Sequence, residues 1–498
     1  MINGAQEKAY LTVGLYERSF GTEASGDFTL PDYQSEIRRI LHVAQTVLPP
    51  AKYIGADAVE FNGTVDYQVI YVGMDGGMYS VPLSTEYSFN VPLERSAELV
   101  DGVTVLCNVC AESVNTRVSA PRRLSIRSRL RPNVRIYGRV PTVSEIASEV
   151  NPMSIYRRSG TCMSLDCEYA TSDIINVTYN VPKTTDDIRV VSADAKVVIS
   201  SQSVSENGID CRGNVLVNML TATEGAGDDV EWKSLKGEIP FEGEIDTQNY
   251  MTGADSRIRG VLSELSVSVG EDGIECNAGI ILEAVVCSNG EVEYTDDVYS
   301  TEAECECVMK QVEPRAAIVC SNMSFTVSER IPLSSTSIPA SAEIIDSMGY
   351  VCIDKCAESN GKYVFSGTAS FVVFYRDGGD IYSADVSVPV RFETEGSANL
   401  PIACFDACAD ATNIRARISD GSLCIDAELI MSADCFGATV VDMVDRVTFG
   451  EPVPPFDAEI VVCYPTEGDT LWSVAKKYKV PTTSVIGSPE NDRFVIIE

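Results

Sequence analysis

Alternation of apolar and polar residues is the dominant pattern along this chain, and it predicts β-strands. In the run 63–71 the apolar side chains fall on every second position, which gives a strand one buried face. Asp75-Gly76-Gly77 follows, and glycine accepts the positive φ of a tight hairpin turn without steric cost. The sequence therefore predicts an antiparallel hairpin here.

The same pattern occurs three times. Strand-like runs begin at Gly63, Gly213 and Gly367, which are 150 and 154 residues apart, and a glycine-rich turn follows each run. A second alternating run recurs at 124–130, 274–282 and 423–431. Repeats of a solenoid are about 20–50 residues long, so a period near 150 predicts three tandem β-rich, sandwich-like domains instead.

The period changes to helical near the C-terminus. Leu471, Val474, Ala475 and Tyr478 are spaced to share one helix face. Asp469 or Thr470 is a suitable N-cap, Gly468 permits a turn before it, Pro481 ends the helix, and Thr482 or Thr483 starts a second, short one. Runs at 459–464 and 493–497 are strand-like, so the segment predicts a β-α-α-β unit.

Composition limits the possible functions. The 498 residues are 45% hydrophobic, which is enough for three or four packed domains, and the net charge of −35 argues against nucleic-acid binding because phosphates would be repelled. Residues 1–20 lack the pattern of a secretory signal, and no run approaches the ~20 apolar residues of a membrane span. We expect a soluble, cytoplasmic protein.

Neither the cysteines nor the other polar residues predict catalysis or a metal site. The cysteine count of 17 is odd, and His42 is the only histidine, so buried, reduced thiols are a better interpretation than zinc ligands. Cys107 and Cys110 form a lone CxxC pair. We find no phosphate-binding loop, nucleophile elbow or HExxH motif. We expect a protein that is not an enzyme and has no metal or cofactor.

Two resemblances are carried by short motifs. Gly468-Asp469-Thr470-Leu471-Trp472, followed by Ala475 and Tyr478, resembles a LysM module. The opening of the first repeat, residues 28–41, resembles the SPOCS repeat of spore-coat morphogenetic proteins, and the second and third repeats keep fainter copies around 181–191 and 338–345. Three such repeats before a C-terminal LysM is similar to the architecture of coat proteins of the SipL type, and the SpoVID type is also similar.

The resemblance gives the expected boundaries. They are an N-terminal segment 1–24, SPOCS-like repeats 25–140, 181–300 and 338–450, linkers 141–180 and 301–337, a proline-rich spacer 451–458 that holds the last module off the third repeat, and a LysM domain 459–498.

The resemblance also implies a function. Proteins of this family are non-catalytic adaptors at the forespore surface in the mother-cell cytoplasm, and they connect coat layers through protein contacts, including a LysM contact with a SpoIVA-like coat ATPase. Self-association and contact with other coat proteins are further possibilities. The alternatives are a LysM protein that binds peptidoglycan or chitin oligomers (N-acetylglucosamine polymers) in the wall or cortex, and a general scaffold.

The expected binding site is the loop and first helix turn of the LysM-like segment, Gly468, Asp469, Thr470, Leu471 and Trp472. The second loop that usually completes a LysM sugar groove is short here, at 487–492. We therefore expect a protein ligand in preference to a glycan.

A basic segment is the remaining unusual feature. Residues 117–139 contain eight arginines and no acidic residue, whereas the equivalent 267–289 has only acidic charges. One interpretation is a solvated strand face with acidic neighbours in the same chain. The others are a docking strand for an acidic partner or second copy, formed by Arg123, Arg127, Arg129 and Arg131, and an anionic membrane surface.

Overall fold

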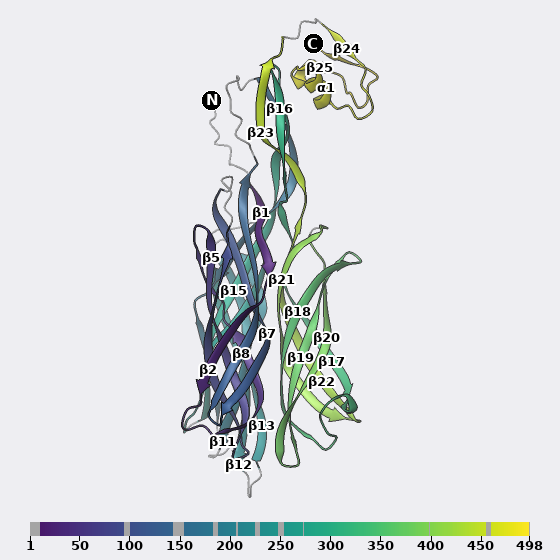
Figure 1. Ribbon diagram of the computed structural model, residues 1–498. Coiled ribbons are helices and arrows are strands. Elements are labelled where there is room, and N and C mark those ends of the chain that lie inside the picture. Colours follow the sequence, from purple (N-terminus) through teal and green to yellow (C-terminus); the bar gives the residue numbers. More distant parts are fainter. Residues whose placement is uncertain are drawn as a thin grey trace.

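The computed structural model describes residues 10–93, 100–142, 154–182, 188–205, 208–224, 230–247, 253–271, 273–397, 399–454 and 460–497. Strands dominate these residues, so the expected mainly β class is confirmed. The strands form three units and an arm, and a small C-terminal module lies at the end of the arm (Figure 1). The arm consists of β9 (Ile155–Thr171), the end of β15 (Gly273–Ser300) that pairs with it, β16 (Ala303–Val312) and β23 (Val441–Pro452).

Each unit is a succession of long antiparallel strands. The first unit has β1 (Tyr10–Ser19), β2 (Thr22–Thr29), β3 (Ile37–Val47), β4 (Ala51–Ile54), β5 (Ala58–Gly73), β6 (Met78–Pro92), β7 (Val100–Ala120) and β8 (Arg123–Pro141). The second has β9 (Ile155–Thr171), β10 (Ile175–Pro182), β11 (Ile188–Ser205), β12 (Gly208–Glu224), β13 (Val230–Asp246), β14 (Asp255–Val269) and β15 (Gly273–Ser300). The third has β16 (Ala303–Val312), β17 (Arg315–Pro332), a 3-10 turn at Leu333–Ser335, β18 (Glu343–Ser359), β19 (Lys362–Asp377), β20 (Asp380–Thr394), β21 (Ile402–Ser419), β22 (Ser422–Ala438) and β23 (Val441–Pro452).

The three units share one strand order. Three strands form a meander in each: β3-β5-β6, β11-β12-β13 and β18-β19-β20. A later long strand of each unit, β8, β15 or β22, pairs on one side with the strand before it. On its other side, β8 pairs with β1 and β2, β15 pairs with β9 and β10, and β22 pairs with β17. The repeated sequence pattern therefore corresponds to a repeated topology.

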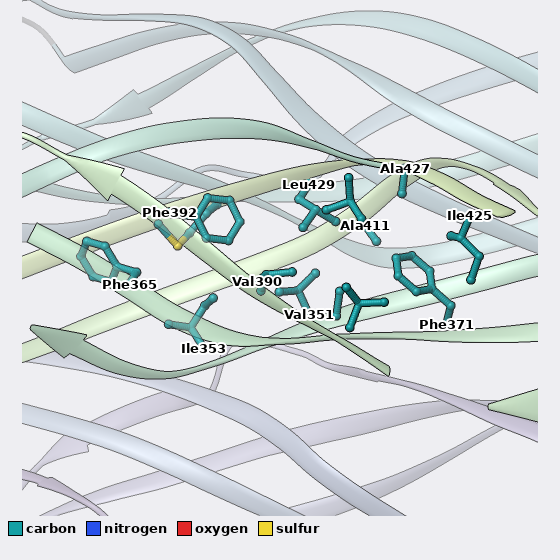
Figure 2. Packing of buried hydrophobic residues seen from close by; sticks show 14 of the residues in the cluster. Val351, Ile353, Phe365, Phe371, Val390, Phe392, Ala411, Ile425, Ala427 and Leu429 are labelled. Atoms are coloured by element: carbon teal, nitrogen blue, oxygen red, sulfur yellow. The ribbon is translucent and has the colours of Figure 1, made fainter. Parts of the chain in front are cut away.

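The predicted alternation places the expected side chains inside. Val65, Tyr67, Val69 and Tyr71 are buried in the first unit, as are the apolar positions of 274–282 and 423–431 in the second and third. In the third unit, Phe365 and Phe371 from the meander belong to the same buried cluster as Ile425 and Leu429 from β22, and Phe371 lies beside Ile425 (Figure 2). The turn after β19 has Gly378 at φ 59° and Gly379 at φ 91°, as a tight hairpin requires.

Both segments expected as linkers contain paired strands, and in this respect the expectation is wrong. Most of 155–182 is β9 and β10, which pair with β15, and most of 303–332 is β16 and β17, which pair with β23 and β22. The N-terminal segment likewise includes β1, paired with β8. The division into SPOCS-like domains stays a prediction.

The units meet at one end through an apolar junction. We use this name for Leu41, Ile70, Val191, Leu220, Phe374 and their neighbours, a cluster to which all three units contribute. Ile70, Leu220 and Phe374 hold equivalent positions on β5, β12 and β19. A β-bulge also recurs beside them, because the pairing register shifts at Leu41, Val191 and Ile345.

Beside this junction, equivalent arginine–tyrosine contacts join different pairs of units. Arg39 of the first unit lies over the ring of Tyr382 in the third, at 4.4 Å from its centroid. Arg189 of the second unit lies over Tyr79 in the first, at 4.7 Å, and donates to the Met78 carbonyl at 2.8 Å. Successive units therefore meet through equivalent surfaces, which gives the body pseudo-three-fold symmetry.

The units also meet through a charged junction, which we define as Arg135 of the first unit, Arg257 of the second, and Asp406 and Asp434 of the third. Arg257 Nε lies 2.5 Å from Asp434 Oδ2, its Nη2 lies 2.9 Å from Asp406 Oδ2, and Arg135 forms a two-atom ion pair with Asp434. All four side chains are buried. Asn108 Nδ2 donates a hydrogen bond to Asp406 Oδ1 at 3.0 Å.

The C-terminal module is small. It has β24 (Val461–Cys463), helix α1 (Leu471–Tyr478), a 3-10 turn (Thr482–Ser484), β25 (Val485–Ile486) and β26 (Val495–Ile497), with sheet order β24-β26-β25. The second helix expected after Pro481 is only this 3-10 turn. Residues 455–459, in the expected spacer, lie outside the described part of the chain, and 451–452 belong to β23.

Candidate functional site

The expected binding loop has a well-formed helix start. Gly468 has φ 95°, and Thr470 caps α1 in a reciprocal capping box with Ser473. The Asp469 carboxylate accepts hydrogen bonds from the Thr466 backbone N–H at 2.7 Å and its hydroxyl at 2.9 Å. These bonds lower the pKa of Asp469, so the loop keeps an anionic, structured edge.

The buried face of α1 differs from the predicted one by one position. Val474 and Ala475 are buried and Tyr478 is half-buried, as the period predicts. Leu471, however, is exposed. Trp472, which lies outside the predicted apolar stripe, is half-buried instead, because it contacts the arm.

Asp297 on β15 binds two side chains of helix α1 in the terminal module. Trp472 Nε1 donates to Asp297 Oδ2 at 2.7 Å, and Lys476 Nζ lies 2.7 and 2.9 Å from the two carboxylate oxygens. Burial alone would raise the pKa of Asp297, but the bonds from Lys476 and Trp472 hold it below its ordinary value. The carboxylate is therefore charged and fully engaged at neutral pH.

An aromatic contact accompanies this ion pair. The Tyr299 ring lies edge-on to Trp472, with centroids 4.9 Å apart, and stacks on Tyr156 at 5.2 Å. Its hydroxyl donates to the Val480 carbonyl at 2.8 Å. Tyr299 thus belongs to the same buried cluster as the core of the module.

A bulge in the arm positions Asp297. The register between β15 and β9 shifts between Thr295 and Asp297. Asp296 pairs with Arg158 at 3.0 Å, while the next residue, Asp297, faces the module. A bulge re-aims side chains in this way, so adjacent carboxylates serve two contacts.

The terminal module is therefore attached to the arm and is not held away by a free spacer (Figure 1). Lys479 adds an ion pair with Glu304 of β16 at 3.0 Å. These contacts are with residues 297–304, before the expected third repeat at 338–450, so the expectation that the spacer holds the module off that repeat stays a prediction.

The sheet of the module has an exposed apolar surface, which we call the terminal apolar face. Val462 and Ile486 both lie opposite Ile496 in the ladder, so the three side chains share one side of the sheet. Val462 and Ile486 are about half exposed, as is Phe494, whose ring lies 6.4 Å from the more exposed Tyr464. Each of these four side chains is more exposed than Leu471 of the predicted loop, which is 40% exposed.

The four arginines of the predicted docking strand lie on β8, and three of them form ion pairs with carboxylates of the same chain. Arg127 pairs with Glu23 at 3.1 Å and Arg129 with Glu112 at 3.1 Å. Arg131 lies 3.6 Å from Asp354 of the third unit. Arg123 is exposed. These ion pairs match the interpretation in which acidic neighbours come from the same chain, and a role in docking stays a prediction.

Comparison with protein-family models, with curated proteins and with solved structures finds no match for this chain. Among the described residues, no helix has the length and apolar content to cross a bilayer. Within the same residues, no group of three or more His, Cys, Asp or Glu side chains is arranged to hold a metal ion.

Proposed function

We propose that this protein is a non-catalytic assembly adaptor of the spore coat, in which a three-unit body and its arm hold a LysM-like module against a coat protein. The observation that carries the proposal is the terminal apolar face, because a concentration of exposed apolar side chains on a small module is typical of a protein interface. The resemblance to SPOCS and LysM proteins supplies the partner, a SpoIVA-like coat ATPase at the forespore surface in the mother-cell cytoplasm.

The contacts of Trp472 favour protein over glycan as the ligand. Sugar recognition commonly uses the faces and polar edges of aromatic rings, and here the indole N–H donates to Asp297 while the ring packs on Tyr299. The loop Gly468–Leu471 is still accessible at its edge. The alternative, peptidoglycan or chitin-oligomer binding, would use this edge.

A binding measurement on the full chain tests the proposal. We expect the purified protein to bind a SpoIVA-type ATPase polymer, and expect Val462→Asp combined with Ile486→Asp to reduce the affinity at least tenfold. Phe325→Asp is a matched control, because Phe325 is a similarly exposed apolar residue on β17 of the third unit. No binding by the wild type, or equal losses in both variants, would contradict the proposal.

Chitin oligomers separate the two candidate ligands. If NMR titration shifts the Asp469 loop at millimolar or lower concentration and the ATPase does not bind, the glycan function replaces the adaptor function.

A further inference from the structure

The three units surround a cavity of about 1390 Å³ between the apolar and charged junctions. Its wall comes from β3 and β7 of the first unit, β11 and β14 of the second, and β17, β18, β21 and β22 of the third. On β3 the wall begins at His42, next to Leu41 of the apolar junction, and on β21 it begins at Ala407, next to Asp406 of the charged junction. A cavity with a few converging polar groups is the usual kind of site for a small ligand.

An ion pair between two units borders this cavity. Lys196 of β11 and Asp410 of β21 both belong to the wall, and Lys196 Nζ donates to Asp410 Oδ1 at 3.0 Å. Their side chains are 25% and 40% exposed, whereas no side chain of the charged junction is more than 8% exposed. A solute in the cavity can therefore reach both members of this pair, while the charged junction has no room for one.

The wall carries a further charge of each sign. Asp194 lies two residues before Lys196, so the two side chains project from the same side of β11, and Asp194 also lines the cavity. Arg259 of β14 lines it as well, with Nη1 at 3.0 Å from Asn108 Oδ1 and at 3.5 Å from Glu283 Oε2. The wall thus offers two cations and two carboxylates from the second and third units.

The charges at Lys196 and Asp410 depart from the repeat. Lys196 lies five residues after the register shift at Val191, and Asp410 pairs with Ile430 in the repeated run of β22. The equivalent wall positions in the other units are uncharged: Thr46 and Tyr350 correspond to Lys196, and Cys110 and Val261 correspond to Asp410. Packing of the units around the cavity therefore does not require a charge at either position. Departures of this kind from a regular pattern are expected at functional sites.

We propose that this part of the wall binds a zwitterionic ligand of the α-amino-acid type. In such a ligand one carbon separates the ammonium from the carboxylate, so its two charges lie close together, as Lys196 Nζ and Asp410 Oδ1 do. The ligand carboxylate contacts Lys196 and its ammonium contacts Asp410, so each protein charge exchanges one counter-charge for another and neither is left unpaired. Arg259 and Asp194 provide a second charge of each sign in the same wall.

Apolar neighbours of the ion pair indicate the kind of ligand side chain. Val198 follows Lys196 by two residues on the same side of β11, and Ile430 lies opposite Asp410 in the ladder of β21 and β22. Both residues line the cavity. An apolar ligand side chain is therefore expected beside the paired charges. This site belongs to the body, so its ligand is independent of the partner proposed for the terminal apolar face.

Calorimetric titration of the full-length protein at neutral pH tests this with three small probes. They are 2-aminopentanoate, pentanoate, which lacks its ammonium group, and butylamine, which lacks its carboxylate. We expect 2-aminopentanoate to bind with a millimolar or lower Kd, and each of the singly charged probes to bind at least tenfold more weakly. Equal affinities for the three probes, or no binding of 2-aminopentanoate, would overturn the proposal. So would a preference for butylamine, because it would show that a wall that also includes Asp255 and Glu428 selects cations alone.

Two variants locate the site. Lys196→Met and Asp410→Asn should each weaken the binding of 2-aminopentanoate at least tenfold. Lys310→Met is the matched control, because Lys310 forms a similar ion pair with Asp445 at 3.3 Å on the arm, outside the cavity wall. Unchanged binding in both wall variants, or an equal loss in the control, would contradict the assignment. The comparison of probes uses the wild-type protein, so it is decisive even if a variant folds poorly.

Discussion

The apolar junction and the charged junction join the same three units by opposite means. At the apolar junction the units contribute equivalent residues, such as Ile70, Leu220 and Phe374, so this junction preserves the symmetry of the repeat. At the charged junction the equivalent positions on β8, β15 and β22 are Arg135, Val285 and Asp434. Their cross-strand partners are Leu106, Arg257 and Asp406.

This difference shows how a repeat becomes three distinguishable parts. Equivalent apolar surfaces hold any neighbouring unit, because burial of apolar area is not directional. Buried charges accept only a partner of opposite charge, so Asp406 and Asp434 place the third unit between the arginines of the first and second. The apolar junction supplies cohesion, and the charged junction fixes the order of the units.

The largest effect is expected from removing one charge. Asp434→Ala leaves Arg135 and Arg257 buried with Asp406 as their remaining nearby carboxylate, and breaking a buried pair in this way costs about 3–5 kcal/mol. The free energy of unfolding from urea titration measures the loss. A control replaces both members of one pair, Arg135→Met with Asp434→Leu, and should lose much less because no charge is left uncompensated. A loss below about 1 kcal/mol for Asp434→Ala would show that the junction is not sensitive to charge.

A cavity at the apolar junction should cost somewhat less. Leu220 is 1% exposed, and Leu220→Ala is expected to lower the free energy of unfolding by about 3 kcal/mol through lost burial and an incompletely filled cavity. The equivalent Ile70→Ala is the matched variant in the first unit. Similar losses for the two would support symmetric packing. Trp232, which packs against this cluster, provides a fluorescence signal for the transition.

The ammonium group of Lys52 lies at a separate contact between the first and second units, and pH measurements can test how its charge affects stability. Although the side chain is exposed as a whole, its Nζ lies 2.8 Å from the Val105 carbonyl and 3.9 Å from the centroid of the Tyr169 ring of the second unit. Desolvation lowers the pKa of Lys52 to about 8, while nearby Cys107 and Glu283 oppose the shift.

The sign follows from linkage. The folded pKa lies below the ordinary value near 10.5, so between these two pH values the unfolded chain binds more protons and stability rises with pH. The charged ammonium therefore destabilises the fold below pH 8, and this penalty disappears as the pH rises to about 10.5. Lys52→Met should gain Tm over the wild type at pH 7, and the gain should shrink at pH 10. A gain that does not change with pH would contradict this account.

The smallest effect is expected on the exposed part of β8. Arg127 and Arg129 are about two-thirds exposed and pair with Glu23 and Glu112, so Arg127→Glu with Arg129→Glu should change the unfolding free energy by about 1 kcal/mol or less. If these residues form a docking strand, sedimentation or liposome binding at low salt will change in the variant. If neither measurement changes, these arginines act only through ion pairs within the chain.

The sequence predicted the strands well where one face is apolar and one is polar, because alternation is a direct consequence of burial on one side of a sheet. It also contained a sign of the bulges beside the apolar junction. Leu41, Val191 and Ile345 each follow another apolar residue, which breaks the alternation at the point where the register shifts. An extra residue in a strand produces this doublet.

The first of the segments expected as linkers was misread for a physical reason. Most side chains of β9 are half-buried or exposed, so the strand has little apolar alternation, and it is held largely by its ladder with β15 more than 100 residues away. Backbone hydrogen bonds of this kind leave no mark on side-chain composition. The strand therefore resembles a loop in sequence.

Contacts of the C-terminal module were predictable only in part. The cap at Thr470 and the buried Val474 and Ala475 follow from local rules. The contact of Trp472 with Asp297 joins residues 175 positions apart, and no local pattern specifies it. One signal was present, since a tryptophan outside the apolar stripe of a short helix needs some other surface to cover it.

Strand β15 has a consequence for the dimensions of the molecule. At about 3.3 Å per residue its 28 residues span roughly 90 Å, so the strand acts as a ruler between the body and the terminal module. Adding two residues to each strand of the arm would lengthen the ruler while Asp297 and Tyr299 kept their orientation. Adding one would turn both side chains to the opposite side and leave the module without its attachment. The separation between body and module can therefore change only in steps of two residues.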